Sequence, residues 1–310
     1  MVDIVITEFM DESAIEDLRR DFTVHYDRDL AKRPEAIMEI AADAPALVVR
    51  NVTQVRGALL AALPNLKVVG RLGVGLDNID VEECARRGIK VFPATGANTV
   101  SVAEYVIAAM LVAARDVWRA SEAVLEGAWP RNDLMLGEVA GKRLGLIGFG
   151  AIARAVADRA RALDVDIVAS DPVVAADDPA WSRHGAARVE LDALLRTSDF
   201  VSIHAPLVDS TRNLLDAARL AVMKPGAVVI NTARGGIVDE AALAAALKAG
   251  RLGGAVLDVF DREPLAAGSP LVGAPRLRVT PHIAGVTREA NSRVSTVTAH
   301  HVRNALRGNR

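Results

Sequence analysis

The stretch LGLIGFGAIARAVADRA, residues 144–160, decides how the second half of this chain folds. A short apolar run ends at Gly148, and Gly148, Gly150 and Ala153 then stand in the pattern G-x-G-x-x-A. Gly148 permits a tight turn, Gly150 lets an anion approach the backbone, and the small Ala153 allows close packing of helix on strand. The stretch therefore predicts a strand, a turn and a helix whose N-terminal N–H groups bind a phosphate.

An acidic residue follows at the distance that a dinucleotide site requires. The next predicted strand, VDIVASD at 165–171, ends in Asp171, 21 residues after Gly150. A carboxylate there accepts a hydrogen bond from a ribose 2′-OH. It also repels a 2′-phosphate, and residues 171–178 contain no arginine to receive one, so the sequence favours NAD over NADP. The alternative interpretation of Asp171 is a turn residue before Pro172.

The rest of the chain alternates short β-rich runs with helical ones. This alternation predicts βαβ units and parallel sheets with helices on both faces. The expected strands of the first half lie in 3–8, 22–26, 46–51, 66–73 and 89–94, and those of the second half in 142–150, 165–171, 187–206, 226–236, 253–260 and 276–285. We expect an α/β fold of two doubly wound parallel-sheet domains, Rossmann-like or flavodoxin-like, with the active site in the cleft between them.

Two long helical stretches complete the expected organisation. Residues 98–127 read as one helix, with Ser101 and Glu104 as a capping box at its start, and this helix is too apolar to lie free in water. Residues 287–308 read as a C-terminal helix that returns to the first domain. The expected domains are 1–97 with 284–310, which binds substrate, and 98–283, which binds NAD.

Composition excludes several function classes. The net charge is −2, with 37 basic and 39 acidic residues, which gives no reason to expect nucleic acid or an anionic membrane as partner. Cys84 is the only cysteine, which excludes an intrachain disulfide and a cysteine-rich zinc site, and we read it as a small buried residue on a helix. No metal site is expected. The N-terminus lacks signal-peptide features, and the longest uncharged apolar run, 105–114, is about half of what a bilayer needs. We therefore expect a cytoplasmic protein.

Three late strands are each followed by a polar residue: Arg234, Glu263 and His282. Ligands of open parallel sheets bind beyond the carboxyl ends of the strands, so these side chains could converge on one site. Histidine serves as base or acid near neutral pH, a carboxylate fixes its tautomer, and arginine holds a substrate carboxylate in planar, two-point geometry. Together they suit hydride transfer between NAD and a 2-hydroxy acid. The alternatives are a helix cap for Arg234, a loop acid for Glu263 and a loop donor for His282.

Several motifs carry a family resemblance that covers nearly the whole chain. LGLIGFGAIA, NTARGGIVDE, LDVFDREP, TPHIAGVTRE, GRLGVGLDNID and NTVSVAEYV resemble the D-isomer-specific 2-hydroxyacid dehydrogenase family. The departures are Ala153 for the last glycine of the fingerprint and Ala205, where relatives often carry a hydroxyl residue.

The resemblance assigns roles to individual residues. It implies Arg234, Glu263 and His282 as the catalytic set, with His282 as acid and base, and Asp258 as a partner of the nicotinamide amide. Further cofactor contacts would come from Gly148, Gly150, Ala151, Ile152, Asp171, His204, Pro206, Thr232, Ala233, Arg234, His282 and Gly285. Substrate contacts would come from Arg71, Gly73, Val74, Gly75, Asn98 and Arg234. The resemblance also implies a homodimer.

The substrate remains open at this stage. The motifs look closest to the phosphoglycerate and (S)-sulfolactate branches of the family, whose substrates carry a second anionic group, and Arg71 could hold that group. The alternative for Arg71 is a surface ion pair with Asp77 or Asp80. Glyoxylate or hydroxypyruvate reduction is the second enzyme hypothesis, and a non-catalytic NAD-sensing protein is the hypothesis from a different class. His25, His184, His300 and His301 match no motif and are expected at the surface.

Overall fold

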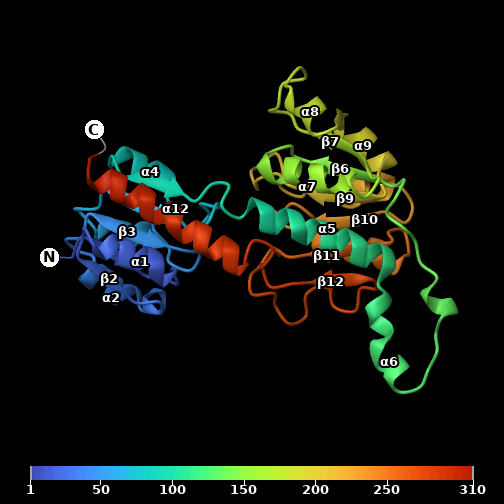
Figure 1. The fold of residues 1–310 in the computed structure, drawn as a ribbon, viewed down its shortest axis with the longest axis horizontal. Coiled ribbons are helices and arrows are strands. Elements are labelled where there is room, and N and C mark those ends of the chain that lie inside the picture. Colours follow the sequence, from blue (N-terminus) through green and yellow to red (C-terminus); the bar gives the residue numbers. More distant parts are fainter. Residues whose placement is uncertain (1, 309–310) are drawn as a thin grey trace. The chain divides into compact units, whose positions relative to one another are not determined.

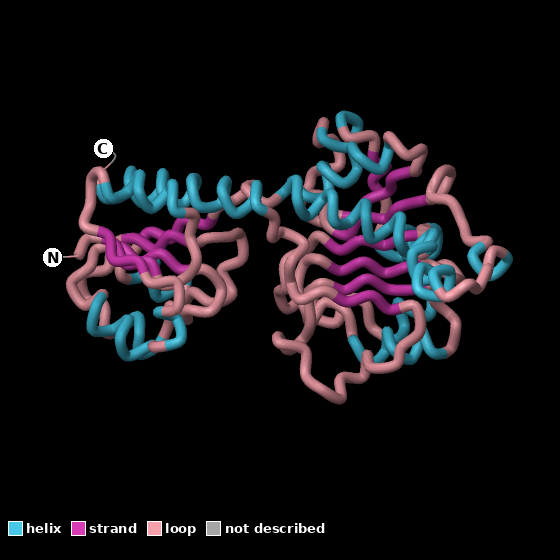
Figure 2. Tube along the Cα trace, turned by 60° about the horizontal axis from the view of Figure 1, so that its bottom comes forward, coloured by secondary structure: helices cyan, strands magenta, loops and turns pink. Residues whose placement is uncertain are grey.

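The computed structural model describes residues 2–308, and the chain divides into two compact units. One unit comprises the described parts of Met1–Asn98 and Val286–Arg310, and the other comprises Thr99–Gly285. Each unit is a parallel sheet covered by helices (Figures 1 and 2). The predicted class, two parallel-sheet α/β domains, is confirmed.

The sheet of the first unit has the strand order β2-β1-β3-β4-β5, and all its pairs are parallel. Its strands are β1 (Ile4–Ile6), β2 (Val24–Tyr26), β3 (Ala46–Val49), β4 (Val68–Arg71) and β5 (Lys90–Pro93). Its helices are α1 (Glu12–Arg19), η1 (Leu30–Lys32), α2 (Pro34–Ile40), α3 (Gly57–Ala61), α4 (Val81–Arg86) and α12 (Arg288–Leu306). Side chains alternate between the two faces of the strands, so α1 and α12 cover one face and α2, α3 and α4 the other.

The C-terminal helix α12 packs on the first unit, as the sequence predicts. It lies against α1, β4 and β5, and Val294 and Val302 are buried there. Gly70 makes this possible, because a Cβ at that position would lie 2.7 Å from Val302 Cγ2. Arg303 also binds Asp17, with 2.7 Å between Nη1 and Oδ2.

The sheet of the second unit has the order β12-β11-β10-β9-β6-β7-β8, again parallel throughout. Its strands are β6 (Arg143–Ile147), β7 (Asp166–Ser170), β8 (Ala186–Arg188), β9 (Phe200–Ile203), β10 (Val228–Asn231), β11 (Gly254–Leu257) and β12 (Leu277–Val279). Its helices are α5 (Thr99–Arg115), η2 (Val117–Ala120), α6 (Ser121–Leu125), η3 (Asn132–Leu134), α7 (Ala151–Arg161), α8 (Ala180–Arg183), α9 (Leu191–Thr197), α10 (Ala217–Val222) and α11 (Glu240–Lys248). The strand order reverses between β6 and β9, which is where a dinucleotide binds in this class of sheet.

The expected helix 98–127 is shorter than predicted. Helix α5 ends at Arg115, and Asp116 has φ 28°, which breaks the helical path before η2 and α6. Because α5 already begins at Thr99, Ser101 lies inside the first turn, and the predicted cap at Ser101 is wrong. Ala103, Val106, Ala109 and Met110 of α5 are buried in the core of the second unit, where α5 lies against α7.

The predictions for the cysteine and for the four histidines without a motif differ in their outcome. Cys84 is fully buried on α4, as predicted. Of the four histidines expected at the surface, only His300 is exposed, and His25, His184 and His301 are partly buried. His184 is held by Asp158, with 2.8 Å between Nδ1 and Oδ1. Within residues 2–308, no helix is long and apolar enough to cross a membrane.

Candidate active site

The glycine turn between β6 and α7 has the shape of a phosphate cradle. Gly148 has φ 87°, and a Cβ there would lie 2.9 Å from the carbonyl of His204, so only glycine fits. Gly150 is the N-cap of α7, and a Cβ at that position would meet nothing within 4 Å. Among the described residues, no backbone hydrogen bond involves the N–H groups of Gly150, Ala151 and Ile152. These N–H groups are therefore available to a pyrophosphate at the helix N-terminus.

Asp171 stands at the end of β7 beside this turn. Its Oδ2 accepts from the N–H of Phe149 at 2.7 Å, and its Oδ1 accepts from Val173 and Val174 at 2.8 and 3.1 Å. The residue thus forms the turn before Val173, and it also ties that turn to the glycine loop. A carboxylate oxygen can accept more than one hydrogen bond, so the ribose role stays compatible with this geometry.

We expect Asp171→Ala to lose most of its preference for NAD over NADP, by roughly ten- to hundred-fold, because a charged hydrogen bond to the ribose is removed. The measurement is kcat/KM with both cofactors. Asp171→Asn is the matched control, because it keeps an oxygen for the turn but removes the charge that repels a 2′-phosphate. An unchanged cofactor ratio in both variants would reduce Asp171 to a turn residue.

Two further polar groups stand at the ends of β9 and β10, which are neighbouring strands of the same sheet. His204 follows β9, and its Nε2 lies 2.9 Å from the Oγ of Ser202. Burial lowers the pKa of His204 to about 4, so the ring is neutral at physiological pH. Thr232 follows β10, and its Oγ1 is buried with no hydrogen-bond partner in the described chain. A buried hydroxyl without a hydrogen bond costs folding free energy. The Thr232 hydroxyl is therefore suited to a hydrogen bond with a bound cofactor.

The depressed pKa of His204 predicts acid sensitivity. The unfolded chain binds a proton at His204 below about pH 6.5, whereas the folded chain does so only near pH 4, so stability falls as the pH falls through this window. At pH 5 the free energy of unfolding is lower than at neutral pH by at most about 2 kcal/mol. Water that reaches the ring makes this difference smaller. Urea unfolding at pH 7.5 and 5 should show this loss, and His204→Gln should reduce it. An equal pH dependence in both proteins would contradict the assignment.

His282 and Glu263 form the pair that the sequence predicts. The Nδ1 of His282 lies 2.7 Å from the Oε2 of Glu263, and the Oε1 of Glu263 accepts from the N–H of Phe260 at 3.1 Å. The side chains are 45% and 36% exposed, so a substrate can reach the ring. With Nδ1 on the carboxylate, Nε2 is the nitrogen that can exchange a proton with a substrate.

The loop that carries His282 is anchored by a buried acid. Asp258 is 1% exposed, and its carboxylate accepts from the N–H groups of Ile283 and Ala284 at 2.8 and 2.7 Å and from the Oγ1 of Thr280 at 2.5 Å. His282 itself has φ 57° and donates its N–H to the Asp258 carbonyl at 2.8 Å. The left-handed backbone turns the ring out of the strand direction, and these bonds hold it there. Asp258 is therefore a loop anchor, and its contact with a nicotinamide stays a prediction.

Arg234 lies on a loop that is packed directly against the loop of Glu263. A Cβ on Gly235 would lie 1.9 Å from the carbonyl oxygen of Phe260, so a side chain is excluded at that position. The N–H of Gly236 donates to Asp261 at 2.6 Å. The Nη1 of Arg234 donates to the Ala233 carbonyl at 2.6 Å. The loops that contain Arg234, Glu263 and His282 follow β10, β11 and β12. Because these three strands are adjacent and parallel, the loops lie at the same edge of the second sheet.

The predicted substrate loop belongs to the first unit, after β4. The N–H groups of Val74 and Gly75 make no backbone hydrogen bond in the described chain, so they can receive a carboxylate. Arg71 is turned back onto this loop, with its Nη1 2.7 Å from the Leu72 carbonyl and against Gly73. Asn98 has a buried Oδ1 without a hydrogen-bond partner among residues 2–308. Asp80, one of the two predicted ion-pair partners of Arg71, caps α4 by accepting from the N–H of Glu83.

Comparison with known proteins identifies the family. Residues 107–284 match the sequence model of the D-isomer specific 2-hydroxyacid dehydrogenase NAD-binding domain, which is more than half of the chain. The chain belongs to this family. The match confirms NAD as the cofactor and the predicted class, an NAD-dependent oxidoreductase of 2-hydroxy acids.

Relatives within the 2-hydroxyacid dehydrogenase family extend the match to the whole chain. An (S)-sulfolactate dehydrogenase of Chromohalobacter salexigens is 52% identical over 306 residues, covering 99% of both chains. A D-3-phosphoglycerate dehydrogenase of Archaeoglobus fulgidus is 40% identical, and this chain spans 57% of its length. A D-lactate dehydrogenase of Aquifex aeolicus, solved with NAD and lactic acid, superposes with a TM-score of 0.87 at 27% identity, covering 99% of this chain and 96% of that chain.

The sequence did not reveal the residues that support the site. Thr280 and Tyr105 form a hydrogen-bonded chain behind Asp258, with 2.5 Å between the Tyr105 hydroxyl and Thr280 Oγ1. Burial raises the pKa of Tyr105, so its hydroxyl stays protonated. Among the described residues, no group of three or more His, Cys, Asp or Glu side chains is arranged to hold a metal ion.

Proposed function

We propose that this enzyme oxidises a 2-hydroxy acid that carries a second anionic group, of the sulfolactate or phosphoglycerate type, to the corresponding 2-oxo acid. The observation that carries the acid–base part is the 2.7 Å contact between His282 Nδ1 and Glu263 Oε2. The substrate class is supported by the 52% identity with an (S)-sulfolactate dehydrogenase over nearly the whole of both chains.

The proposed roles of the residues follow from their chemistry. The residues of the glycine turn, together with Asp171 and Thr232, fit NAD, and the chemistry that NAD supplies is acceptance of the hydride from C2. His282 takes the hydroxyl proton at Nε2, so the substrate loses one hydride and one proton. Glu263 holds the imidazole in the required tautomer and stabilises the imidazolium that forms. Arg234 binds the substrate carboxylate through its planar guanidinium.

A panel of 2-hydroxy acids with NAD tests this proposal. We expect the highest kcat/KM with sulfolactate or phosphoglycerate, and lower values with lactate and glycerate, which lack the second anion. Preference for glyoxylate or hydroxypyruvate in the reductive direction would favour the alternative enzyme function. Tight NADH binding without turnover on any acid would favour a non-catalytic NAD-sensing protein.

We also propose that the protein is a homodimer. The segment from α6 to η3 reaches away from the sheet of the second unit (Figure 1). Its side chains Leu125, Trp129 and Met135 are 88%, 80% and 81% exposed, and such an apolar surface is typical of an interface. Light scattering should give the molar mass of two chains. The double variant Leu125→Ser, Trp129→Ser should lower this mass toward that of a single chain. A cytoplasmic location stays a prediction, supported by the use of NAD.

A further inference from the structure

Two acidic side chains tie together the loops that follow β10 and β11. Glu240 is the first residue of α11, and its Oε1 accepts from the N–H of Asp261 at 2.8 Å. Asp261 lies two residues before Glu263. Its Oδ1 accepts at 2.6 Å from the N–H of Gly236, which lies two residues after Arg234. Each acid therefore fixes a backbone group of the opposite loop.

The hydrogen bond to Glu240 fixes one peptide group of the loop after β11, the group that joins Phe260 and Asp261. The N–H of this peptide donates to Glu240. Its carbonyl oxygen packs against the loop after β10, because a Cβ on Gly235 would lie only 1.9 Å from it. A peptide group is planar, so contacts on both of its sides define its orientation.

The carboxylate of Glu263 depends on the position of this peptide. Its Oε1 accepts from the N–H of Phe260 at 3.1 Å, and its Oε2 lies 2.7 Å from Nδ1 of His282. Because Glu263 follows the 260–261 peptide by two residues, a shift of the peptide moves the carboxylate relative to both partners. The hydrogen bond from Asp261 to Glu240 therefore stabilises the orientation of the acid that holds the histidine.

Glu240 is half-buried beside the like charge of Asp261. Burial raises the pKa of the Glu240 carboxyl, and the charge of Asp261 also raises it, while the hydrogen bond from the Asp261 N–H opposes both effects. A carboxylate in such surroundings costs free energy that a fully exposed acid avoids. The hydrogen bond to the 260–261 peptide offsets part of this cost.

A stabilising role at the start of a helix is the alternative explanation, because an acid in the first turn interacts favourably with the helix dipole. Helix α11 already has an acidic cap, since Asp239 is its N-cap and accepts from the N–H of Ala242 at 2.9 Å. Asp239 and Glu240 are neighbours with different partners, one inside the helix and one in the loop after β11. Variants of these two acids can therefore separate helix capping from loop positioning.

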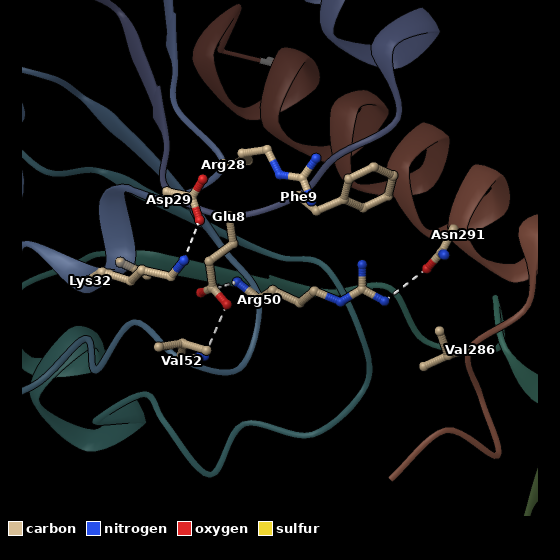
Figure 3. Close-up of a pocket in the computed structure, with 10 residues that line it drawn as sticks. Glu8, Phe9, Arg28, Asp29, Lys32, Arg50, Val52, Val286 and Asn291 are labelled. Carbon is tan, nitrogen blue, oxygen red and sulfur yellow. Dashed lines mark hydrogen bonds and ion pairs between the residues drawn. The ribbon is translucent and has the colours of Figure 1, made fainter. Parts of the chain in front are cut away.

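The first unit contains a more extensive example of an acid that fixes a loop through backbone groups. Glu8 follows β1, is 5% exposed and accepts from the N–H groups of residues 50–53 at distances of 2.9 to 3.2 Å. Figure 3 shows the contacts of Glu8 with Arg50 and Val52. Glu240 holds its loop in the same way, through the backbone, but at a peptide two residues before Glu263.

We propose that Glu240 and Asp261 are positioning residues of the active site. Glu240 holds the loop of Glu263 and so acts on proton transfer at His282. Asp261 holds the loop of Arg234 and so acts on binding of the substrate carboxylate. The inference rests on the proposed function, because both acids act through the proposed catalytic set. The two acids should therefore affect different kinetic constants.

Glu240→Ala should lower kcat for the preferred 2-hydroxy acid roughly ten-fold and change its KM little, because the loop of Glu263 loses a hydrogen bond that orients it. Glu240→Gln should restore most of kcat, since the amide oxygen can still accept from the N–H of Asp261. Asp239→Ala is the matched control, because it removes the neighbouring carboxylate and leaves the loop bond in place. Similar losses of kcat in Asp239→Ala and Glu240→Ala would reduce Glu240 to a helix-stabilising residue and overturn its positioning role.

Asp261→Ala should show the other pattern, a KM for the acid that rises several-fold and a kcat that falls less. This variant keeps its backbone N–H, and with it the bond to Glu240, and loses only the bond from Gly236. Asp261→Asn should keep KM near the wild-type value, since the amide oxygen can accept from Gly236. The same changes of kcat and KM in Asp261→Ala as in Glu240→Ala would overturn the division of roles.

A double-mutant cycle tests whether Glu240 acts through Glu263. Glu240→Ala should cost roughly ten-fold in kcat in the wild-type background but less than about two-fold in Glu263→Gln, because the carboxylate that it positions is then absent. If the two losses simply multiply, Glu240 acts independently of Glu263 and the proposal fails.

Hydrogen exchange provides a test that does not need turnover. Mass spectrometry should show faster exchange of the backbone N–H groups of residues 259–263 in Glu240→Ala than in the wild type and in Asp239→Ala. Unchanged exchange in Glu240→Ala would overturn the proposal and leave the dehydrogenase intact. Absence of turnover on every acid by the wild-type enzyme would instead refute the proposed function, and the exchange measurement would then decide alone whether Glu240 holds the loop.

Discussion

His282→Asn should bind NADH with near-normal affinity and lose roughly 10² to 10⁴ in kcat, the usual worth of a positioned acid or base. The affinity should survive because the glycine turn and Asp171 lie at other strand ends, after β6 and β7. The measurement pairs NADH titration by fluorescence with steady-state turnover. Retention of most of the turnover would remove His282 from the reaction.

Glu263→Gln is the companion variant and should lose less. Glutamine can still accept from the N–H of Phe260, but its amide can present N–H groups to Nδ1 of His282 and so favour the tautomer in which Nε2 already carries a proton. This tautomer lowers the fraction of the enzyme in which Nε2 is free to act as the base in alcohol oxidation. A loss larger than that of His282→Asn would indicate collapse of the 260–263 loop, which circular dichroism and NADH affinity would reveal.

Arg234→Lys should lower kcat/KM by roughly ten- to hundred-fold, although the charge is retained. The planar guanidinium can bind a carboxylate through two parallel hydrogen bonds, and an ammonium group offers no such fork. The loop should stay in place, because Asn231 holds it through backbone atoms: its Nδ2 donates to the Arg234 carbonyl at 2.9 Å and its Oδ1 accepts from the Ala233 N–H at 3.0 Å.

Arg234→Gln, which also removes the charge, should lose more than the lysine variant. The order of kcat/KM among the wild type and the two variants distinguishes the two roles of Arg234. If Arg234 only caps a helix, both variants should lose little kcat/KM, and by similar factors. The measurement is kcat and KM with saturating NAD. Equal activity of the lysine variant and the wild type would exclude two-point recognition of the carboxylate by this residue.

The sequence predicted the sheets because each strand is a short apolar run that ends at turn residues. A segment with helical spacing of its apolar residues then follows most strands. The strand VVIN after Ala227 and the strand GAVL after Gly253 are fully buried, as their composition indicates. The glycine turn was equally predictable, because its G-x-G-x-x-A spacing is local and Gly148, with φ 87°, leaves no room for a Cβ. These features are local, so one sequence was enough to recognise them.

The support of the site could not be predicted, since it depends on contacts between residues far apart in the chain. Asp258 binds the N–H groups of residues 283 and 284, and Glu8 binds those of residues 50–53. Neither acid differs in local sequence from a surface acid. The early end of α5 was missed for another reason. Asp116 adopts a left-handed conformation, and residues 115–120 contain no glycine or proline that would predict a break in the helix.

Transfer of deuterium from C2 of a labelled substrate to the cofactor tests the central claim most directly. The enzyme is incubated with NAD and a sulfolactate or phosphoglycerate carrying deuterium at C2, and the NADH formed is analysed by mass spectrometry. The account predicts one deuterium per NADH, formation of the 2-oxo acid in equal amount, and a turnover that collapses in His282→Asn. NADH without deuterium, or binding of NAD with no turnover of any labelled 2-hydroxy acid, would contradict it.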